Sequence, residues 1–499
     1  MGRIEDISDT EINDRISVLQ STNTLNNWAK TFVATPERIY TPSSVTDLQF
    51  IIEAARRSSV RVRAMGVWHS PSDLACCDEW VVIMTRMNSI EEVSITYNSK
   101  PTTLTNVQID KESRTVTVQS GTLLKDMNEA LDKNGLAIPI LGSISDQTIG
   151  GCLATATHGS GYNHRSMSSY VRSLSLLLSS GDIVLCSREQ HADLFNASLC
   201  SLGATGVMLS VTMDVEEKFN LHEITMPMSF AEYTSSSSAW LDRWQAAPYV
   251  KAFWIPQARG ISLMQSYKSF EKRIQKPSFS LSATIFSYLL QPLLLIKKYI
   301  PGIAPLVSNL AWRYLFSTHQ QRIDKSYNVF NMDCGLLQYT TEWAVPMSGA
   351  YQCLLDLNDW LVNENDVDFP LEIRISKADD IFLSPANSHT AHKDESHFMW
   401  IGLIKYKPYN CRVRYRRIFR TFEDILRKYG GRAHWAKHST QTPQEVGQKY
   451  RDLPKFMDVL NKYDADGMFR NPFIDRHLIT EKDDSFRDFK HHQVEAYGF

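Results

Sequence analysis

The stretch from Leu141 to Gly161 constrains the fold more than any other part of the chain. Its five glycines stand among small and hydroxylic residues, with Ile144, Ile149 and Leu153 between them. A core segment would carry larger side chains, because an interior Gly costs about 1 kcal/mol relative to Ala. A Gly-rich surface loop would carry fewer apolar residues. The pattern therefore predicts a loop whose backbone lies close against a ligand, with amides and hydroxyls as donors.

A second glycine segment precedes it. Val62 and Ala64 alternate with arginines in a short predicted strand that runs into Gly66, and His69 follows at once. Taken alone, this segment favours the simpler explanation that His69 is a turn histidine bonded to nearby backbone. A Gly directly after a strand lets backbone N–H groups converge on an anion. The common dinucleotide fold needs its glycines between one strand and one helix, so two distant glycine segments predict a different cofactor domain.

Short helices and strands alternate between these segments and continue to residue 218, which is typical of an α+β domain over 35–218. A polar lead-in with a helix, 1–34, precedes it, and the remainder, 219–499, is longer and less regularly patterned. The predicted elements are a helix capped by Ser44, strands at 81–84 and 115–118, a helix at 124–131, a short strand at 136–140, a hairpin at 172–187, a helix around 194–199 and a strand at 207–215.

The second domain contains an unusual apolar insertion at 279–316. Its apolar run from Ile285 to Ile296 is shorter than the ~20 residues that span a bilayer, and Pro292 interrupts it. We expect helices packed on the protein. The alternative is a membrane-surface helix flanked by Lys297, Lys298 and Arg313.

Two later segments carry chemistry. In the predicted strand 369–376, Glu372, Arg374 and Ser376 share one face, which indicates either a solvated ion pair or an acid and a guanidinium held against a ligand. Residues 432–438 contain His434 and Lys437. No acid or Cys nearby completes a ligand set, so no metal site is expected.

Composition excludes some functions. The formal net charge is −2, so nothing indicates a nucleic-acid partner. The eight cysteines form no CxxC pair and are expected to be reduced thiols. The N-terminus has acids where a signal peptide has an apolar run. An intracellular protein is therefore expected.

Taken together, the motifs resemble those of the aldonolactone oxidases, flavoproteins of the vanillyl-alcohol-oxidase (PCMH-type) superfamily. The resemblance extends from about Asn27 to Leu478, and its details are most similar to arabinonolactone oxidases of fungi or protists. It rests on Ile39-Tyr40-Thr41-Pro42, His69-Ser70-Pro71-Ser72-Asp73, Gly142-Ser143-Ile144-Ser145, Gly150-Gly151 with Ala156-Thr157-His158-Gly159, Glu372-Ile373-Arg374, His434-Trp435-Ala436-Lys437 and Gly467-Met468-Phe469-Arg470-Asn471-Pro472.

The resemblance implies a PCMH-type FAD domain at 35–218, an α+β substrate (cap) domain at 219–499, and FAD bound covalently through His69. The chain departs from the family at Trp68, where relatives have Gly, and this departure bears on the covalent link. The other implied cofactor-binding residues are Gly66, Val67, Trp68, Ser70, Gly142, Ser143, Ser145, Gly150, Gly151, Thr155, Thr157, His158 and Val207.

The resemblance also implies catalytic roles for Glu372, Arg374, Lys437 and His434. The implied reaction is oxidation of an aldono-1,4-lactone at C2 with O₂ as acceptor, giving an ascorbate-type product and H₂O₂. Gly142 favours an oxidase, since dehydrogenase relatives carry Ala there. A flavin dehydrogenase, an alditol oxidase and a flavin-binding protein with altered activity stay open. By resemblance, the location is the cytoplasm or an organelle membrane, such as the mitochondrial outer membrane.

Overall fold

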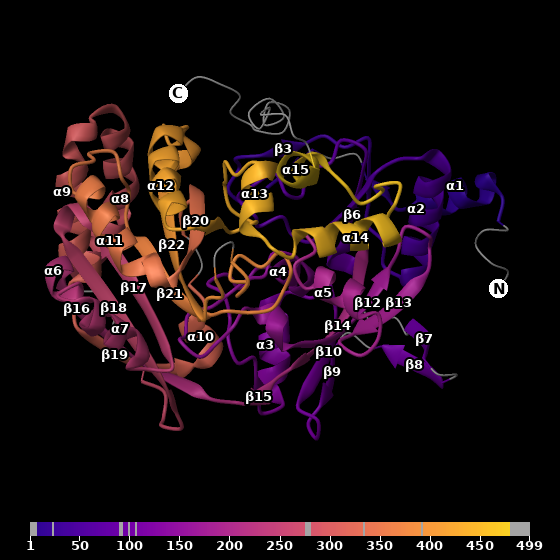
Figure 1. Cartoon of the computed structure of the whole chain (residues 1–499), viewed down its shortest axis with the longest axis horizontal. Helices are drawn as coiled ribbons and strands as arrows, with labels where there is room; N and C mark the ends of the chain where they lie inside the picture. Colours follow the sequence, from indigo (N-terminus) through magenta and orange to yellow (C-terminus); the bar gives the residue numbers. More distant parts are fainter. Residues whose placement is uncertain are drawn as a thin grey trace.

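A computed structural model describes residues 7–21, 24–88, 93–97, 100–104, 107–274, 281–332, 335–390 and 393–479. Two groups of sheets lie side by side along the long axis of the molecule, with the N-terminal elements at the right of Figure 1 and a large sheet at the left. Helices α13 (Pro443–Lys449), α14 (Leu453–Tyr463) and α15 (Pro472–Ile474) return to the N-terminal side.

The first sheet of the N-terminal half brings the strand before Gly66 beside two others. It has the order β1-β4-β6-β5, and β4 and β5 both run parallel to β6. Helix α2 follows Ser44, whose side chain accepts from the Asp47 amide, and buries Leu48 and Ile51 against this sheet. The bounds are α1 (Asp9–Ser17), β1 (Gln20–Ser21), β2 (Leu25–Asn26), β3 (Val33–Ala34), β4 (Arg38–Tyr40), α2 (Val45–Ser58), β5 (Val62–Met65) and β6 (Trp80–Ile83).

A five-stranded antiparallel sheet, β13-β12-β14-β10-β9, lies next to the glycine segment 141–161, whose helix α4 contacts β14. The predicted hairpin and helices are confirmed, but the strand expected at 136–140 is wrong beyond Ala137. Its residues pair only with β15 (Glu216–Glu217), and Pro139 has no N–H to continue the ladder. The bounds are β7 (Val93–Tyr97), β8 (Lys100–Leu104), β9 (Val107–Asp110), β10 (Thr115–Gln119), α3 (Leu124–Lys133), β11 (Leu136–Ala137), α4 (Ile149–Ala154), β12 (Val171–Leu177), β13 (Ile183–Ser187), α5 (Ala192–Ser198) and β14 (Val207–Asp214).

An eight-stranded sheet, β19-β16-β18-β17-β21-β22-β20-β23, forms the second half. Helices α11 and α12 cover one face, where Ile373 of β21 packs with Leu354 and Phe419. Alternate β21 residues point to the opposite face. The bounds are β16 (Asn220–Ser229), α6 (Phe230–Tyr233), α7 (Ser237–Gln245), β17 (Tyr249–Ile255), β18 (Gly260–Ser269), β19 (Gln320–Lys325), α10 (Ser326–Phe330), β20 (Gln338–Pro346), α11 (Met347–Leu361), β21 (Leu371–Lys377), β22 (His397–Tyr406), α12 (Arg416–Lys428) and β23 (Arg432–Ala433).

The insertion is helical, as expected. It comprises α8 (Leu281–Tyr299), α9 (Ala304–Ala311) and a turn at Trp312–Phe316, and it packs on Phe253 of β17. None of the helices in the described ranges combines the length and apolarity needed to span a bilayer. Of the three basic residues named for the alternative, a membrane-surface helix, Lys297 does not reach the surface, because it is buried in an ion pair with Asp368.

The C-terminal segment is tied to the loop after His69. Asn471 Nδ2 donates to the carbonyls of Leu74 and Cys76, each at 2.9 Å. Arg476 forms a buried bidentate pair with Asp73 at 2.7 and 2.8 Å. Two residues that lie 403 positions apart in the sequence thus fix one loop.

The cysteines are consistent with reduced thiols. Cys76, Cys77, Cys152, Cys186, Cys200, Cys353 and Cys411 are free. Cys334 lies outside the described residues.

Candidate functional site

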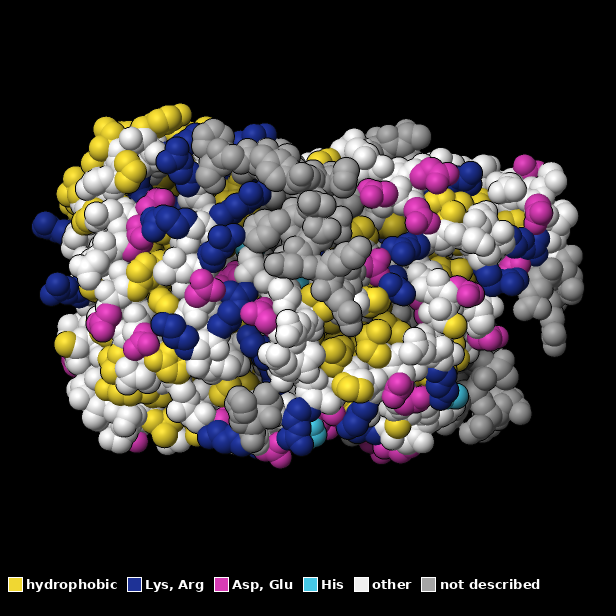
Figure 2. All heavy atoms as spheres, turned by 45° about the horizontal axis from the view of Figure 1, so that its top comes forward, with side chains coloured by type: hydrophobic (Ala, Val, Ile, Leu, Met, Phe, Trp, Pro, Cys, Tyr) yellow, Lys and Arg dark blue, Asp and Glu magenta, His cyan; other side chains and the backbone are white. Residues whose placement is uncertain are grey.

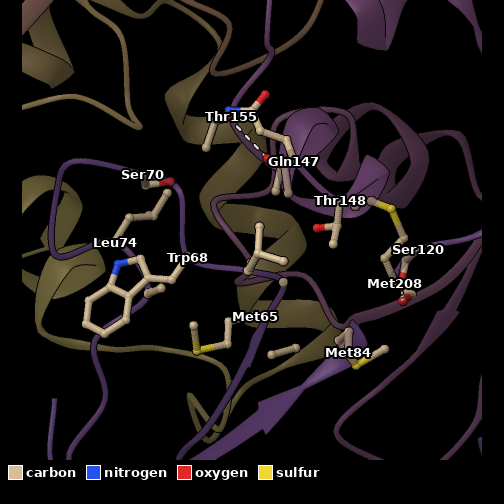
Figure 3. A pocket seen from close by; sticks show the side chains of 18 of the residues that line it. Met65, Trp68, Ser70, Leu74, Met84, Ser120, Gln147, Thr148, Thr155 and Met208 are labelled. Atoms are coloured by element: carbon tan, nitrogen blue, oxygen red, sulfur yellow. Dashed lines mark hydrogen bonds between the residues drawn. The ribbon is translucent and has the colours of Figure 1, made fainter. Parts of the chain in front are cut away.

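The two glycine segments meet around a cavity of about 120 Å³. Figure 3 shows Trp68, Ser70 and Leu74 on one side of it and Gln147, Thr148 and Thr155 on the other. The predicted cofactor residues that line it are Gly66, Val67, Trp68, His69, Ser70, Gly150, Gly151 and Thr155.

Close backbone approach explains Gly66. A Cβ built there would lie 2.1 Å from Thr148 Oγ1, so no other residue fits at position 66 unless Thr148 of the 141–161 segment moves. Gly150 is similarly tight, with 3.0 Å to Ser120 Cβ. These glycines bring two chain segments together, and the wall they form is mostly backbone.

The backbone at Trp68, the residue before His69, is strained. Trp68 has φ of +49°, in the left-handed region that favours Gly. Its indole is buried against Phe32 and Cys76, and Nε1 donates to the Ser72 carbonyl at 3.4 Å. Packing of the ring compensates for the backbone strain, so the loop keeps its turn. His69 stacks on Trp28 with ring centroids 4.8 Å apart.

Arg63 is a cavity residue that sequence reasoning missed. It lies in β5, is only 3% exposed, and lines the cavity. Burial lowers the pKa of its guanidinium to about 10, which still leaves it charged at neutral pH. Among the described residues, its Nε and Nη1 have no hydrogen-bond partner. An unpartnered buried cation in a cavity walled by glycine backbone fits the pyrophosphate of a dinucleotide.

A second cavity of about 370 Å³ adjoins the first, and His69, Ser70, Gln147 and Ala436 line both. Its wall includes the remaining predicted cofactor loop and every predicted catalytic residue. The predicted residues here are Gly142, Ser143, Thr157, His158, Glu372, Arg374, His434 and Lys437.

Glu372 and Arg374 form an ion pair at the polar end of this cavity. Arg374 Nη2 donates to Glu372 Oε2 at 2.6 Å and also to Ser143 Oγ, which connects β21 to the glycine segment. Among the described residues, Glu372 Oε1 is buried without a hydrogen-bond partner. The carboxylate therefore has one oxygen fixed by the guanidinium and one that can accept from a ligand hydroxyl.

Glu342 of β20 is a second carboxylate in this cavity that sequence reasoning missed. Its Oε1 lies 3.4 Å from His158 Nε2 and its Oε2 lies 4.0 Å from Lys437 Nζ. Burial alone would raise its pKa, but the hydrogen bond with His158 and the charges of Lys437 and Arg374 hold the pKa well below its usual range. Glu342 is therefore an anion. No local motif marks it, because its partners come from distant loops.

His434 is a neutral imidazole. Burial lowers its pKa to about 3, and its Nδ1 accepts from the Ala436 amide at 3.1 Å. His158, Glu342 and His434 place one ligand atom each within 4.8 Å of one another. The fold thus supplies the acid that the sequence near His434 lacks. Lys437 beside Glu342 opposes a divalent cation, and the prediction of no metal stays a prediction.

Two predicted cofactor residues line neither cavity. Val207, the first residue of β14, is fully buried in the core, although its neighbours Gly206 and Met208 line the first cavity. Ser145 is half-buried, and its carbonyl accepts from the Lys125 amide. Their predicted roles stay predictions.

Comparison with known proteins places this geometry in a family. A family described as D-arabinono-1,4-lactone oxidase matches residues 211–477, and a family described as FAD binding domain matches residues 36–187. The chain belongs to the D-arabinono-1,4-lactone oxidase family. L-gulonolactone oxidase of Scyliorhinus torazame is 31% identical, covering 90% of this chain and 97% of that protein. D-arabinono-1,4-lactone oxidase of Debaryomyces hansenii is 26% identical over 86% of each.

The same fold occurs in a solved structure with little sequence similarity. A mutant of cholesterol oxidase from Brevibacterium sterolicum is similar with a TM-score of 0.75 at 16% identity, covering 92% of this chain and 97% of that one. The predicted fold class, an FAD-binding domain of the PCMH type with an α+β cap, is confirmed for this lactone oxidase family member.

Proposed function

We propose that this protein is an FAD-dependent oxidase of an aldono-1,4-lactone, acting at C2 with O₂ as acceptor and forming an ascorbate-type product and H₂O₂. The observation that carries the proposal is the Glu372–Arg374 pair at the end of the second cavity that adjoins the glycine-walled one. Family membership supports the reaction class.

The first cavity fits FAD on the ground of Arg63, the buried cation that a pyrophosphate would pair. Bound FAD supplies the hydride acceptor. His69 lines both cavities and stacks on Trp28, which restricts the orientation of its ring. We propose His69 as the attachment residue.

The polar end of the second cavity supplies the groups that the alcohol needs. Glu372 Oε1 accepts the hydrogen bond of the C2 hydroxyl and orients it for loss of its proton. Arg374 and Lys437 hold positive charge where negative charge develops. His434 Nδ1 accepts from the Ala436 amide, so the neutral ring carries its proton on Nε2, where it donates a hydrogen bond and adds no charge.

Gly142 supports O₂ as the acceptor. A Cβ at this position would lie 2.8 Å from Thr157 Cγ2, and both residues line the second cavity. A side chain here would crowd this part of the cavity wall, and glycine leaves it less crowded for a small molecule. A dehydrogenase or an alditol oxidase is the competing proposal.

We also propose peripheral membrane contact through the insertion. In Figure 2, hydrophobic atoms gather at the upper left, the end of the molecule that carries α8 and α9 in Figure 1. Exposed apolar residues there are Ile285, Tyr288, Leu289, Ile296, Tyr299, Ile300 and Leu306, and Lys298 and Arg313 are exposed beside them. An intracellular location at the cytoplasmic side of an organelle membrane agrees with this surface.

The test is oxidation by the purified holoprotein of D-arabinono-, L-galactono- and L-gulono-1,4-lactone, with alditols as comparison, while H₂O₂ is followed. We expect peroxide with at least one lactone, and Glu372→Gln should lower kcat/KM by about 100-fold or more. Yellow colour that stays with acid-precipitated protein would establish a covalent link, and its loss in His69→Ala would assign that link to His69. Oxidation only with an artificial acceptor would favour a dehydrogenase, and no oxidation of any lactone would contradict the proposal.

A further inference from the structure

The second cavity is polar at one end and apolar at the other. Strand register divides its floor into rows of side chains that run across the eight-stranded sheet. The first row is Phe253, Glu372, Gly402 and Glu342; the next contains Ile404 and Thr340; the third contains Tyr406 and Gln338.

The spacing of the rows can be compared with the length of the substrate. Each strand residue advances by about 3.3 Å, so the second and third rows lie about 7 and 13 Å beyond Glu372. From C2 to C6 of a hexonolactone there are four C–C bonds of about 1.5 Å, which span at most about 6 Å. If C2 lies at Glu372, as the proposed function requires, the sugar does not reach the row of Tyr406.

Apolar side chains from the insertion enclose this outer part. Leu290 of α8 and Phe316 line the cavity together with Met332 and Leu336. The Phe316 ring meets Phe253 of the first row edge to face, with centroids 5.9 Å apart, so the apolar wall begins beside that row. Gln291, next to Leu290, accepts from the Tyr409 amide at 3.1 Å, which holds α8 close to the end of β22. Packing therefore fixes an apolar wall that faces the polar residues Thr340, Gln338 and Tyr406 of the outer rows.

We propose that the outer part of the cavity is a subsite for an apolar group on the substrate. The inferred substrate class is an aldono-1,4-lactone whose terminal hydroxyl, the one furthest from C2, carries an acyl or alkyl group. The sugar occupies the polar end and the apolar group lies between Leu290, Phe316 and Ile404. This subsite rests on the proposed function, and it specifies which chemical group the substrate carries at the end furthest from C2.

The experiment compares L-gulono-1,4-lactone with its 6-O-butanoyl ester as substrates of the holoenzyme. Each buried methylene contributes a factor of about four in binding, so kcat/KM for the ester is expected to be about tenfold higher. Leu290→Gln should reduce this ratio toward one. Leu289→Gln is the matched control, because Leu289 is the adjacent, 49% exposed residue and does not line the cavity.

The outcomes distinguish failure of the subsite from failure of the proposed lactone oxidase function. Equal kcat/KM for ester and parent, or an ester preference that Leu290→Gln leaves intact, overturns the subsite while the lactone oxidase stands. If neither compound is oxidised and no other lactone is, the proposed function fails, and the subsite is judged by binding alone. In that case a larger rise in Tm with the ester than with the parent, lost in Leu290→Gln, supports it, and equal shifts overturn it.

Discussion

Glu342 contacts three groups that the chain supplies from two separate loops. Its carboxylate lies between His158 of the glycine segment and Lys437 of the loop after β23, and its backbone carbonyl accepts from the His434 amide at 2.9 Å. His158 in turn stacks on Trp400 with centroids 3.6 Å apart. Glu342 thus acts as a positioning residue for Lys437, and its anionic charge offsets one of the two cations at the reacting end.

Replacing Glu342 with Gln should lower kcat/KM for the lactone by about ten- to a hundredfold, since one charge-assisted contact is worth about 1.5–3 kcal/mol. FAD content should stay the same, because Glu342 does not line the first cavity. Steady-state kinetics and the absorbance of bound flavin measure both.

Glu53→Gln is the control for that variant. Glu53 is also buried and ion-paired, with Arg56 and Arg57, but it lies on α2 outside both cavities. Glu53→Gln should lower the free energy of unfolding and leave kcat/KM for the lactone unchanged. If Glu342→Gln behaves like Glu53→Gln, the positioning role is wrong.

At the scale of elements, α8 presents two faces with different partners. One face carries Phe286 and Leu294 into the core and Leu290 to the cavity, and the other leaves Ile285 and Tyr288 exposed at 50% and 79%. Exposed apolar residues on a helix that is otherwise packed mark an interaction surface. The same helix therefore carries the exposed apolar surface on one face and part of the wall of the second cavity on the other.

We expect the double variant Ile285→Ser, Tyr288→Ser to bind vesicles of phosphatidylcholine with about 30% phosphatidylserine about tenfold more weakly than the wild type. Vesicle cosedimentation measures this. Val18→Ser is the control, because Val18 is 80% exposed on the separate helix end at α1. Equal sedimentation of the wild type and the double variant, or no sedimentation of either, would contradict membrane contact through α8.

Local patterns predicted most elements and the residues that belong to motifs. Alternation in β21 placed Glu372 and Arg374 on one face, and the Ser44 cap placed the start of α2. Arg63 and Glu342 escaped prediction because each lies in an ordinary strand pattern, and its importance depends on which distant segment the fold brings opposite. The burial of Lys297 was not predicted for the same reason, since its partner Asp368 is 71 residues away.

Across the whole molecule, buried histidines make acid a source of instability. Burial lowers the pKa of His164 to about 4 and of His434 and His477 to about 3. Each lies below the unfolded value of about 6.5. Above about pH 6.5 both states are neutral and the stability is intact. As the pH falls from about 6.5 toward 3, the unfolded chain binds protons that the folded chain cannot, so the free energy of unfolding falls.

His477→Gln should make that fall shallower by at most about 1.4 kcal/mol per pH unit between about pH 6 and 4. His477 is buried beside Arg476, so its protonation in the fold is opposed by burial and by that charge. Urea unfolding at several pH values measures the slope. His319→Gln, at an exposed position, should leave the slope unchanged; a slope that His477→Gln also leaves unchanged would contradict the assignment.

The bonds from Asn471 and Arg476 to the loop at Leu74 and Asp73 have a consequence for biosynthesis. A ribosome adds roughly 5–20 residues per second, so roughly 20–80 s separate the emergence of Asp73 from that of Arg476. During that interval the nascent chain holds both glycine segments but lacks the residues that fasten the loop beside His69. The loop beside His69 therefore reaches its final contacts only after Arg476 has emerged, and a chain truncated before Asn471 should lack the bonds that fasten this loop.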